Sequence, residues 1–250
     1  MNERPLLQAA RQGNCSLLKE LIDKILSNPG TSVEHGIMVR MRNEINSAFF
    51  MSCIQEDQNM FDILLNSGLV DPGFEGNICI KEVCMKGNVK MAERLLKHPR
   101  VDPAYGDSAI VDTVCRKSQL PILRLLKGDG RVSFEPVSHN PLAIACTQGD
   151  LDIVDFLLDE CDVDPSRLIC QSLRNACEHN RVEVVRRLMR DPRTEPSIMD
   201  NDALKYVAQN GCSVTCRILM NSSKFRWTRG CDIALCYACL HSNWDVADIL

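Results

Sequence analysis

Aromatic residues are scarce in this chain: the 250 residues include two tryptophans, three tyrosines and seven phenylalanines, or 5% in all. A globular enzyme of this size normally uses more of them in its core, whereas stacked helices fill thin layers with Leu, Ile, Val, Ala and Cys. The glycine-rich phosphate loop, the His-Glu-x-x-His motif and the Gly-x-Ser-x-Gly elbow are also missing from the sequence. We therefore expect no enzymatic activity, no catalytic residue, no cofactor and no metal site.

Long runs of one residue class are missing as well. No window approaches 18 uninterrupted apolar residues, so no transmembrane helix is expected. No run of Lys and Arg reaches five residues and the formal net charge is -4, which makes nucleic acid and anionic membranes poor candidate partners. The chain begins without a basic-then-apolar signal region. Together with fourteen cysteines, this predicts a reducing compartment, the cytoplasm or the nucleus.

What the sequence does contain is a 31-residue repeat. Its spacing is followed by six cysteines, with Ala208 at the one skipped position: Cys53, Cys84, Cys115, Cys146, Cys177 and Cys239. A leucine follows each of these positions after eleven residues: Leu64, Leu95, Leu126, Leu157, Leu188, Leu219 and Leu250. Such a period is typical of a solenoid, in which one small unit is stacked on the next. We therefore expect an all-α array over residues 1–250.

The best-preserved unit, residues 140–165, predicts two short helices. Asn140 is a suitable N-cap and Pro141 suits the first helical position, where its missing N–H costs nothing. Gly149 is expected to end this helix in a left-handed conformation, and Asp150 to begin the second helix. A Val-Asp-Pro turn ending at Pro165 closes the unit. The same pattern predicts about eight units, which start near Arg4, Ser47, Ile78, Ala109, Asn140, Gln171, Asp202 and Ile233.

One joint departs from the period. Ala10 and Cys53 are 43 residues apart, so 12 extra residues lie between positions 29 and 47. Insertions in a solenoid are forced outward because the inner layers must still stack. The insertion is partly apolar, and the sequence leaves two alternatives: an early extension of the next helix or a small surface flap. Either a tolerated loop or a partner-binding element is compatible with it.

The unit resembles an ankyrin repeat. Residues 141–149 resemble that family's first helix and turn, and residues 152–158 resemble its second helix. The resemblance covers about residues 4–250, although the period is two residues short of the family's usual 33 and only Pro5 and Pro141 keep the opening proline. These departures concern the loops that project between units rather than the helix pairs. Tetratricopeptide and HEAT-type arrays are the rival solenoids, but the roughly ten connecting residues in each unit suit an ankyrin-like loop better.

The resemblance implies a protein–protein interaction scaffold that binds its partner on the concave face. By the same resemblance, this face comprises the loop before each first helix and the two residues before the glycine position. The candidate partner-binding residues there are Lys86, Tyr105, Arg116, Lys117, Gln148, His179, Ile198 and Trp227. The basic residues among them predict a partner that is acidic at that level. An alternative is that the array recruits substrates for a larger enzyme or serves as a ubiquitin-ligase adaptor.

The last unit carries two further hypotheses. Cys236-x-x-Cys239 resembles half a zinc site or a redox pair, but Cys239 occupies the periodic core position, so a metal or redox protein is the weakest alternative. The final unit also lacks a polar outer face, which a solenoid end normally has. From Trp244, Val246, Ile249 and Leu250 we expect exposed apolar surface, and hence that the chain is a fragment of a longer array or that this end docks on another chain.

Overall fold

A computed structural model describes residues 5–27, 35–106, 109–135 and 140–250. Within these ranges the regular secondary structure is entirely helical, and no helix there is long and apolar enough to cross a membrane. The chain divides into two compact units, one of residues 1–110 and 121–132 and one of residues 111–120 and 133–250. The all-α repeat fold predicted from the period is confirmed, whereas a single continuous array remains a prediction.

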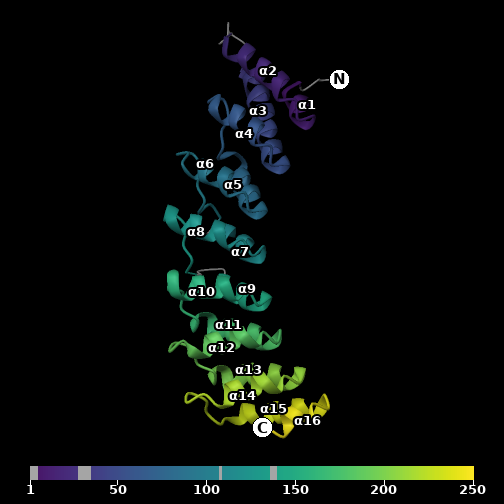
Figure 1. The fold of residues 1–250 in the computed structure, drawn as a ribbon, viewed down its shortest axis with the longest axis vertical. Helices are drawn as coiled ribbons and strands as arrows, with labels where there is room; N and C mark the ends of the chain where they lie inside the picture. The colour runs from purple at the N-terminus through teal and green to yellow at the C-terminus, as the bar shows by residue number, and fades with distance from the viewer. Residues whose placement is uncertain (1–4, 28–34, 107–108, 136–139) are drawn as a thin grey trace. The chain divides into compact units, whose positions relative to one another are not determined.

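The first unit contains three helix pairs and most of a further second helix (Figure 1). Its elements are α1 (Pro5–Arg11), α2 (Cys15–Ser27), α3 (His35–Gln55), α4 (Gln58–Asn66), α5 (Phe74–Lys86), α6 (Val89–Leu96) and most of α8 (Leu120–Asp129). Along the chain, α3 packs against α1 and then α5 packs against α3. First helices therefore stack on first helices, as a repeat array requires.

The second unit contains most of α7 and the four remaining helix pairs. Its elements are α7 (Ala109–Arg116), α9 (Pro141–Gln148), α10 (Leu151–Asp155), a π-helical turn η1 (Phe156–Glu160), α11 (Arg167–Glu178), α12 (Val182–Arg190), α13 (Ile198–Asn210), α14 (Ser213–Met220), α15 (Arg229–Leu240) and α16 (Trp244–Ala247). The first helices α9, α11, α13 and α15 pack in that order (Figure 1). Together, α10 and η1 form the second helix of the best-preserved repeat.

The periodic cysteines and leucines line the core, as the sequence predicts. Cys53, Cys84, Cys115, Cys146 and Cys177 are all fully buried, and so is Leu157. Small thiols suit these positions because helices that meet there approach closely. Cys239 is the exception and is exposed. It lies on α15, which packs against α13 on one side.

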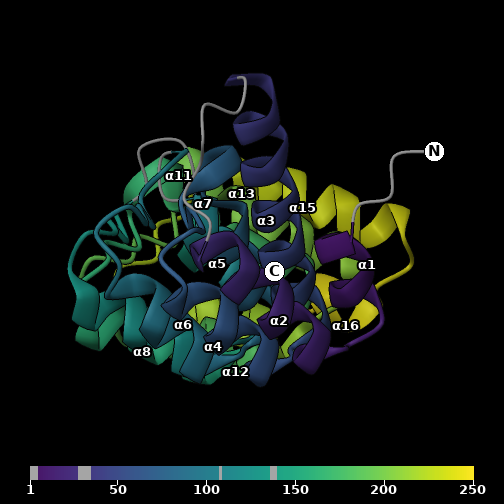
Figure 2. The same cartoon turned by 90° about the horizontal axis from the view of Figure 1, so that it is seen from above.

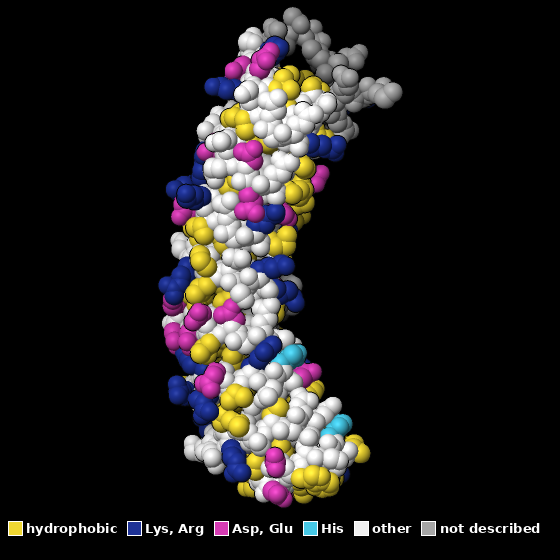
Figure 3. All heavy atoms as spheres, turned by 45° about the vertical axis from the view of Figure 1, so that its right-hand side comes forward, with side chains coloured by type: hydrophobic (Ala, Val, Ile, Leu, Met, Phe, Trp, Pro, Cys, Tyr) yellow, Lys and Arg dark blue, Asp and Glu magenta, His cyan; other side chains and the backbone are white. Residues whose placement is uncertain are grey.

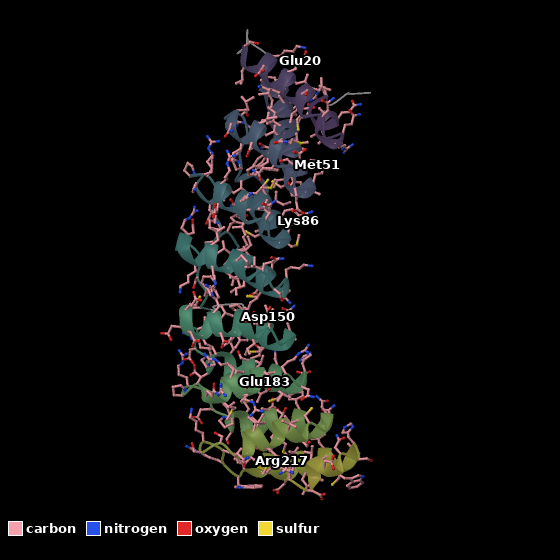
Figure 4. All side chains as sticks on the ribbon, in the orientation of Figure 1. Glu20, Met51, Lys86, Asp150, Glu183 and Arg217 are labelled. Carbon is pink, nitrogen blue, oxygen red and sulfur yellow. The ribbon has the colours of Figure 1, made fainter. Side chains whose placement is uncertain are left out.

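The glycine position after each first helix adopts the left-handed conformation in every repeat. Gly149 has φ 82°, and the same position is occupied at positive φ by Gly13, Glu56, Gly87, Ser118, Asn180, Gly211 and Ser242. The residue after this turn begins the second helix. Asp57, Asn88 and Asp150 accept a hydrogen bond from a backbone N–H in the first turn of α4, α6 and α10, and Figure 4 labels Asp150 at this point.

Buried asparagines fix the Val-Asp-Pro turns. Oδ1 of Asn46 accepts from the backbone N–H of Asp71 at 3.0 Å, and Oδ1 of Asn77 accepts from that of Asp102 at 2.8 Å. The Asp102 side chain in turn accepts from the N–H of Ala104 at 2.9 Å, which closes an Asx turn. In these two repeats, an asparagine of the first helix therefore positions the turn at the end of the same repeat.

Basic residues at equivalent positions of two repeats tie a turn to the preceding one. In the first unit, Arg131 donates to the carbonyl oxygens of Leu96 and Val101 at 2.7 and 2.6 Å. In the second unit, Lys224 donates to the carbonyl oxygen of Thr194 at 3.0 Å. Charge-assisted bonds of this kind satisfy carbonyls that the end of a helix leaves unpaired. These cations therefore stabilise the stack.

Asp191 anchors one of these turns and gives it a pH dependence. Its carboxylate accepts from Nε and Nη2 of Arg193 at 3.0 and 2.8 Å, and this hydrogen bonding lowers the pKa of Asp191. Because the folded-state pKa is lowered, the stabilisation is present above the ordinary Asp pKa and is lost as pH falls through the folded-state value. We expect Asp191→Asn to lower the free energy of unfolding by about 1–3 kcal/mol at neutral pH.

Urea titrations from neutral to acid pH measure this effect. The difference between Asp191→Asn and the unsubstituted chain should shrink as pH falls below the ordinary Asp pKa. Asp152→Asn is the matched control, because Asp152 is exposed and forms no ion pair with another described residue. If Asp191→Asn lowered the free energy of unfolding equally at neutral and acid pH, the ionised Asp191 carboxylate would not be the source of the stabilisation.

The insertion continues the next helix toward its N-terminus, which decides between the two alternatives that the sequence left open. α3 begins at His35, and Figure 2 shows its first turns projecting beyond α1 and α2. Within the extension, Oε1 of Glu44 accepts from the backbone N–H groups of Leu6 and Leu7 at 2.8 and 3.2 Å. The extension thus caps the N-terminus of α1. Residues 28–34 of the insertion lie outside the described ranges.

Candidate partner-binding surface

The predicted binding residues in the first unit are Lys86 and Tyr105. Lys86 ends α5 (labelled in Figure 4), and its Nζ donates to the carbonyl oxygen of Ile54 at 2.6 Å and lies 3.8 Å from Oε1 of Glu56. Tyr105 lies in the loop after α6 and is 52% exposed. Its ring has Lys81 Nζ 5.0 Å from its centroid. Lys86 therefore links two layers, and Tyr105 presents a large, rigid side chain to solvent.

The predicted residues at the ends of first helices in the second unit also link layers. Nε2 of Gln148 donates to the carbonyl oxygen of Arg116 at 2.7 Å. Nδ2 of Asn210, 62 residues further along, donates to that of Glu178 at 2.7 Å. These amides cap the C-terminal carbonyls of the preceding first helix. The side chain of Gln148 thus has a structural role that the sequence did not indicate.

The charged ends of these helices remain in solvent. Arg116 and Lys117 are exposed, and neither forms an ion pair with another residue in the described part of the chain. His179 is exposed as well, with Nδ1 3.0 Å from the carbonyl oxygen of Asn175. Two cations are therefore available at the end of α7.

Ile198 and Trp227 occupy the loop side of the second unit. Ile198 begins α13 and lines an apolar hollow between the loops before α11 and α13. Trp227 is 66% exposed, and its ring lies edge-on to Phe225 with centroids 5.7 Å apart. Local packing therefore holds the indole in place while most of its surface stays in solvent.

Two apolar residues on this surface were not predicted from the sequence. Leu168 and Met199, 31 residues apart, are 48% and 59% exposed. Both have positive φ, of 49° and 51°, a conformation that costs an ordinary side chain about 1–2 kcal/mol. The equivalent residue in an earlier repeat is Glu75 (φ 46°), and a charged residue there could have shown that the position faces solvent.

We call the surface formed by α9, α11, α13, α15, their preceding loops and the end of α7 the first-helix face.

Two adjoining hollows lie on the first-helix face. The first, of about 260 Å³, is lined mainly by apolar side chains, including Leu168, Leu173, Ile198, Met199 and Ala203. The second, of about 270 Å³, is more polar; the residues around it are Asp112, Arg116, Asn140, Ala143, Ile144, Leu168, Gln171 and Asn175. Leu168 and Gln171 border both. The face thus places an apolar site beside a polar one.

The last repeat forms a third hollow, of about 520 Å³, against α15. Tyr237, Leu240 and Cys236 line it, and Leu240 is 75% exposed. Figure 3 shows hydrophobic side chains gathered on the lowest layers of the view, where α15 and α16 lie. Trp244 is 61% exposed, as predicted, whereas Val246 is fully buried in the short helix α16, which packs against α14 and α15.

The cysteines show no arrangement for metal chemistry in the described residues. No group of three or more His, Cys, Asp or Glu side chains there is placed to hold a metal ion. Burial raises the pKa of Cys84 to about 12 and that of Cys216, together with the nearby Cys231, to about 11. Such thiols stay protonated at neutral pH and are poor nucleophiles and ligands.

Comparison with known proteins agrees with this geometry. Residues 80–168 match the family model "Ankyrin repeats (3 copies)". The repeats within residues 80–168 are therefore ankyrin repeats. Among solved structures, the ankyrin repeat domain of Bcl-3, described as a unique member of the IkappaB protein family, superposes with a TM-score of 0.64 at 16% identity over 81% of this chain and 93% of that one. No curated protein matches the sequence. The predicted family is confirmed, and ankyrin repeats typically serve as protein-binding modules.

Proposed function

We propose that the chain is a protein-interaction scaffold that binds its partner through the first-helix face, the concave side in ankyrin-type stacks. The exposed apolar side chains of Leu168, Met199, Tyr237 and Leu240 on this one face are the observation that carries the proposal. Exposed apolar side chains that are gathered on one face mark interaction sites, whereas single scattered ones are ordinary on a protein surface. The hollows between them offer pockets for partner side chains.

Several further observations support this role. The second helices of the same unit face solvent with charged residues that pair with each other: Arg187 bonds Asp155 and Asp159 at 2.5 Å each. On the first-helix face, Arg116 and Lys117 form no ion pair among the described residues, so their charges are available to a partner. All fourteen cysteines are free thiols, which suits the cytoplasm or the nucleus.

Site-specific photo-crosslinking in cells tests the proposal. A photoreactive amino acid at Glu178 or Gln209, both exposed on the first-helix face, should capture a discrete protein partner. The same probe at Glu183 or Arg217, exposed on α12 and α14 and labelled in Figure 4, is the matched control and should capture none. Capture from the second helices alone, or from no position, would contradict the proposed function.

A further inference from the structure

We infer that the two adjoining hollows of the first-helix face bind an extended protein segment that carries an apolar side chain and, three to five residues away, a carboxylate. This inference rests on the proposed function and names the partner's chemistry. The apolar side chain enters the hollow between Leu168 and Met199. The carboxylate lies at the hollow beside Arg116.

The apolar half of the site is built at a conformational cost. Leu168 and Met199 have left-handed backbone in the first turns of α11 and α13, and Met199 is followed by Asp200 and Asn201 at φ 58° and 59°. Runs of left-handed residues are unfavourable for side chains other than glycine. Below the two side chains, Leu173 and Ala203 form an apolar floor that is already buried. A hydrophobic side chain of a partner would therefore be enclosed on several sides.

Unsatisfied polar groups lie at the border of the two hollows and in the first one. The side chain of Gln171, on the border of the two hollows, makes no hydrogen bond with another described residue. Nε of Arg174, which lines the first hollow, is buried without a hydrogen-bond partner in the same described part, and its Nη1 lies 3.7 Å from Oδ2 of Asp202. A carboxamide donates and accepts at once, which matches a peptide unit. These groups suit the backbone of an extended segment.

The charge of the second hollow selects a carboxylate. Asp112 is 7% exposed at its base, whereas Arg116 is exposed at its edge and has no ion pair within the described residues. An incoming carboxylate would pair with the outer guanidinium and avoid the buried Asp112. Opposite charges at an interface chiefly raise specificity and the association rate.

The spacing follows from the stacking distance. Neighbouring layers lie about 8–10 Å apart, so the two hollows, one to one and a half layers apart, are separated by roughly 8–15 Å. A polyproline II segment advances about 3.1 Å per residue and needs no internal hydrogen bonds, so three to five residues span the gap. A helix would need about twice as many residues, because it rises about 1.5 Å per residue.

Selection of random peptides displayed on phage against the full chain tests the inference. Enriched peptides should share an apolar residue and an acidic residue three to five positions apart. A fluorescein-labelled synthetic copy should bind with an affinity that falls at high salt, measured by anisotropy. Failure to enrich peptides, or enrichment without this pair, overturns the inference, whereas the crosslinking result above decides the proposed function separately.

Substitutions in the chain test whether the peptide binds in the two hollows. Leu168→Asn with Met199→Asn removes the apolar side chains but keeps a residue type that tolerates positive φ, so the fold should be retained. This pair should weaken binding about tenfold, and Arg116→Gln about fivefold with a smaller salt dependence. Leu151→Asn with Val214→Asn is the matched control, since both residues are exposed apolar positions on second helices.

The control pair should leave binding unchanged, and thermal unfolding followed by circular dichroism checks that every variant folds. Equal losses in the control and test pairs would overturn the inference. Sedimentation velocity of the chain without peptide tests whether a second copy of the chain fills the hollows instead of a peptide. A dimer that becomes monomeric with Leu168→Asn and Met199→Asn would show that a second copy fills the hollows, which would also overturn it.

Discussion

Replacing Leu157 with alanine should lower the free energy of unfolding by about 2–5 kcal/mol. Leu157 is fully buried in η1, at the leucine position that recurs in every repeat. Its removal leaves a cavity inside a thin layer whose walls are the neighbouring helix pairs. Because each repeat is stabilised by its neighbours, the loss should spread to adjacent layers.

Two measurements check this prediction. Urea unfolding gives the change in stability, and Leu151→Ala, which truncates an exposed leucine at the start of α10, is the control and should cost far less. Amide hydrogen exchange should show faster exchange in α9 and α12, which flank the substituted helix. A loss in the free energy of unfolding no larger than that of Leu151→Ala would argue against a shared core. Faster amide exchange confined to η1 would do the same.

The sequence predicts the helix pairs well because each local rule agrees with the period. Asn140, Gly149 and Asp150 cap and end helices where the pattern places them, and Cys146 and Leu157 are buried in register. A solenoid makes this possible, since each residue's environment is set by its place in one repeat and by the next repeat along. One-dimensional register is therefore enough to give the fold.

The contacts between layers could not be predicted in the same way. Gln148 donates to the backbone of Arg116, and Arg131 donates to the backbone of Val101. The acceptor is a carbonyl group that every residue has, so no residue type in the sequence marks it. The sequence consequently offered Gln148 as a partner-binding residue and did not show its structural role.

The candidate site was predicted only in part for a related reason. Helix ends such as Arg116 and His179 follow from the glycine position, but the conformation of the loops does not. Leu168 and Met199 appear apolar and therefore core-like in the sequence, and only their positive φ turns them outward. Left-handed backbone at residues other than glycine leaves little trace in composition. The apolar half of the proposed site thus emerges from the structure alone.

The layers of α13 and α15 approach each other closely at Gly230. A side chain added there should therefore cause a large loss of stability. Gly230 lies buried near the start of α15, and a Cβ atom there would overlap the backbone carbonyl of Asp200. Nearby, Nδ2 of Asn201 donates to Oγ1 of Thr228 at 2.7 Å, which ties α13 to the start of α15. Because the obstacle is backbone, it cannot swing aside as a side chain could. We expect Gly230→Ala to cost about 3 kcal/mol by separating α15 from α13.

Gly128→Ala provides the matched control with the opposite sign. Gly128 also lies in a helix, α8, but a Cβ atom added there meets nothing within 4 Å and its φ is not in the left-handed range. Alanine should stabilise that helix by about 0.5–1 kcal/mol, because it loses less chain entropy than glycine on folding. Urea unfolding of both variants measures the difference. If Gly230→Ala also stabilised the chain, only the helical preference of alanine would be acting. That result would contradict the close packing of α13 against α15.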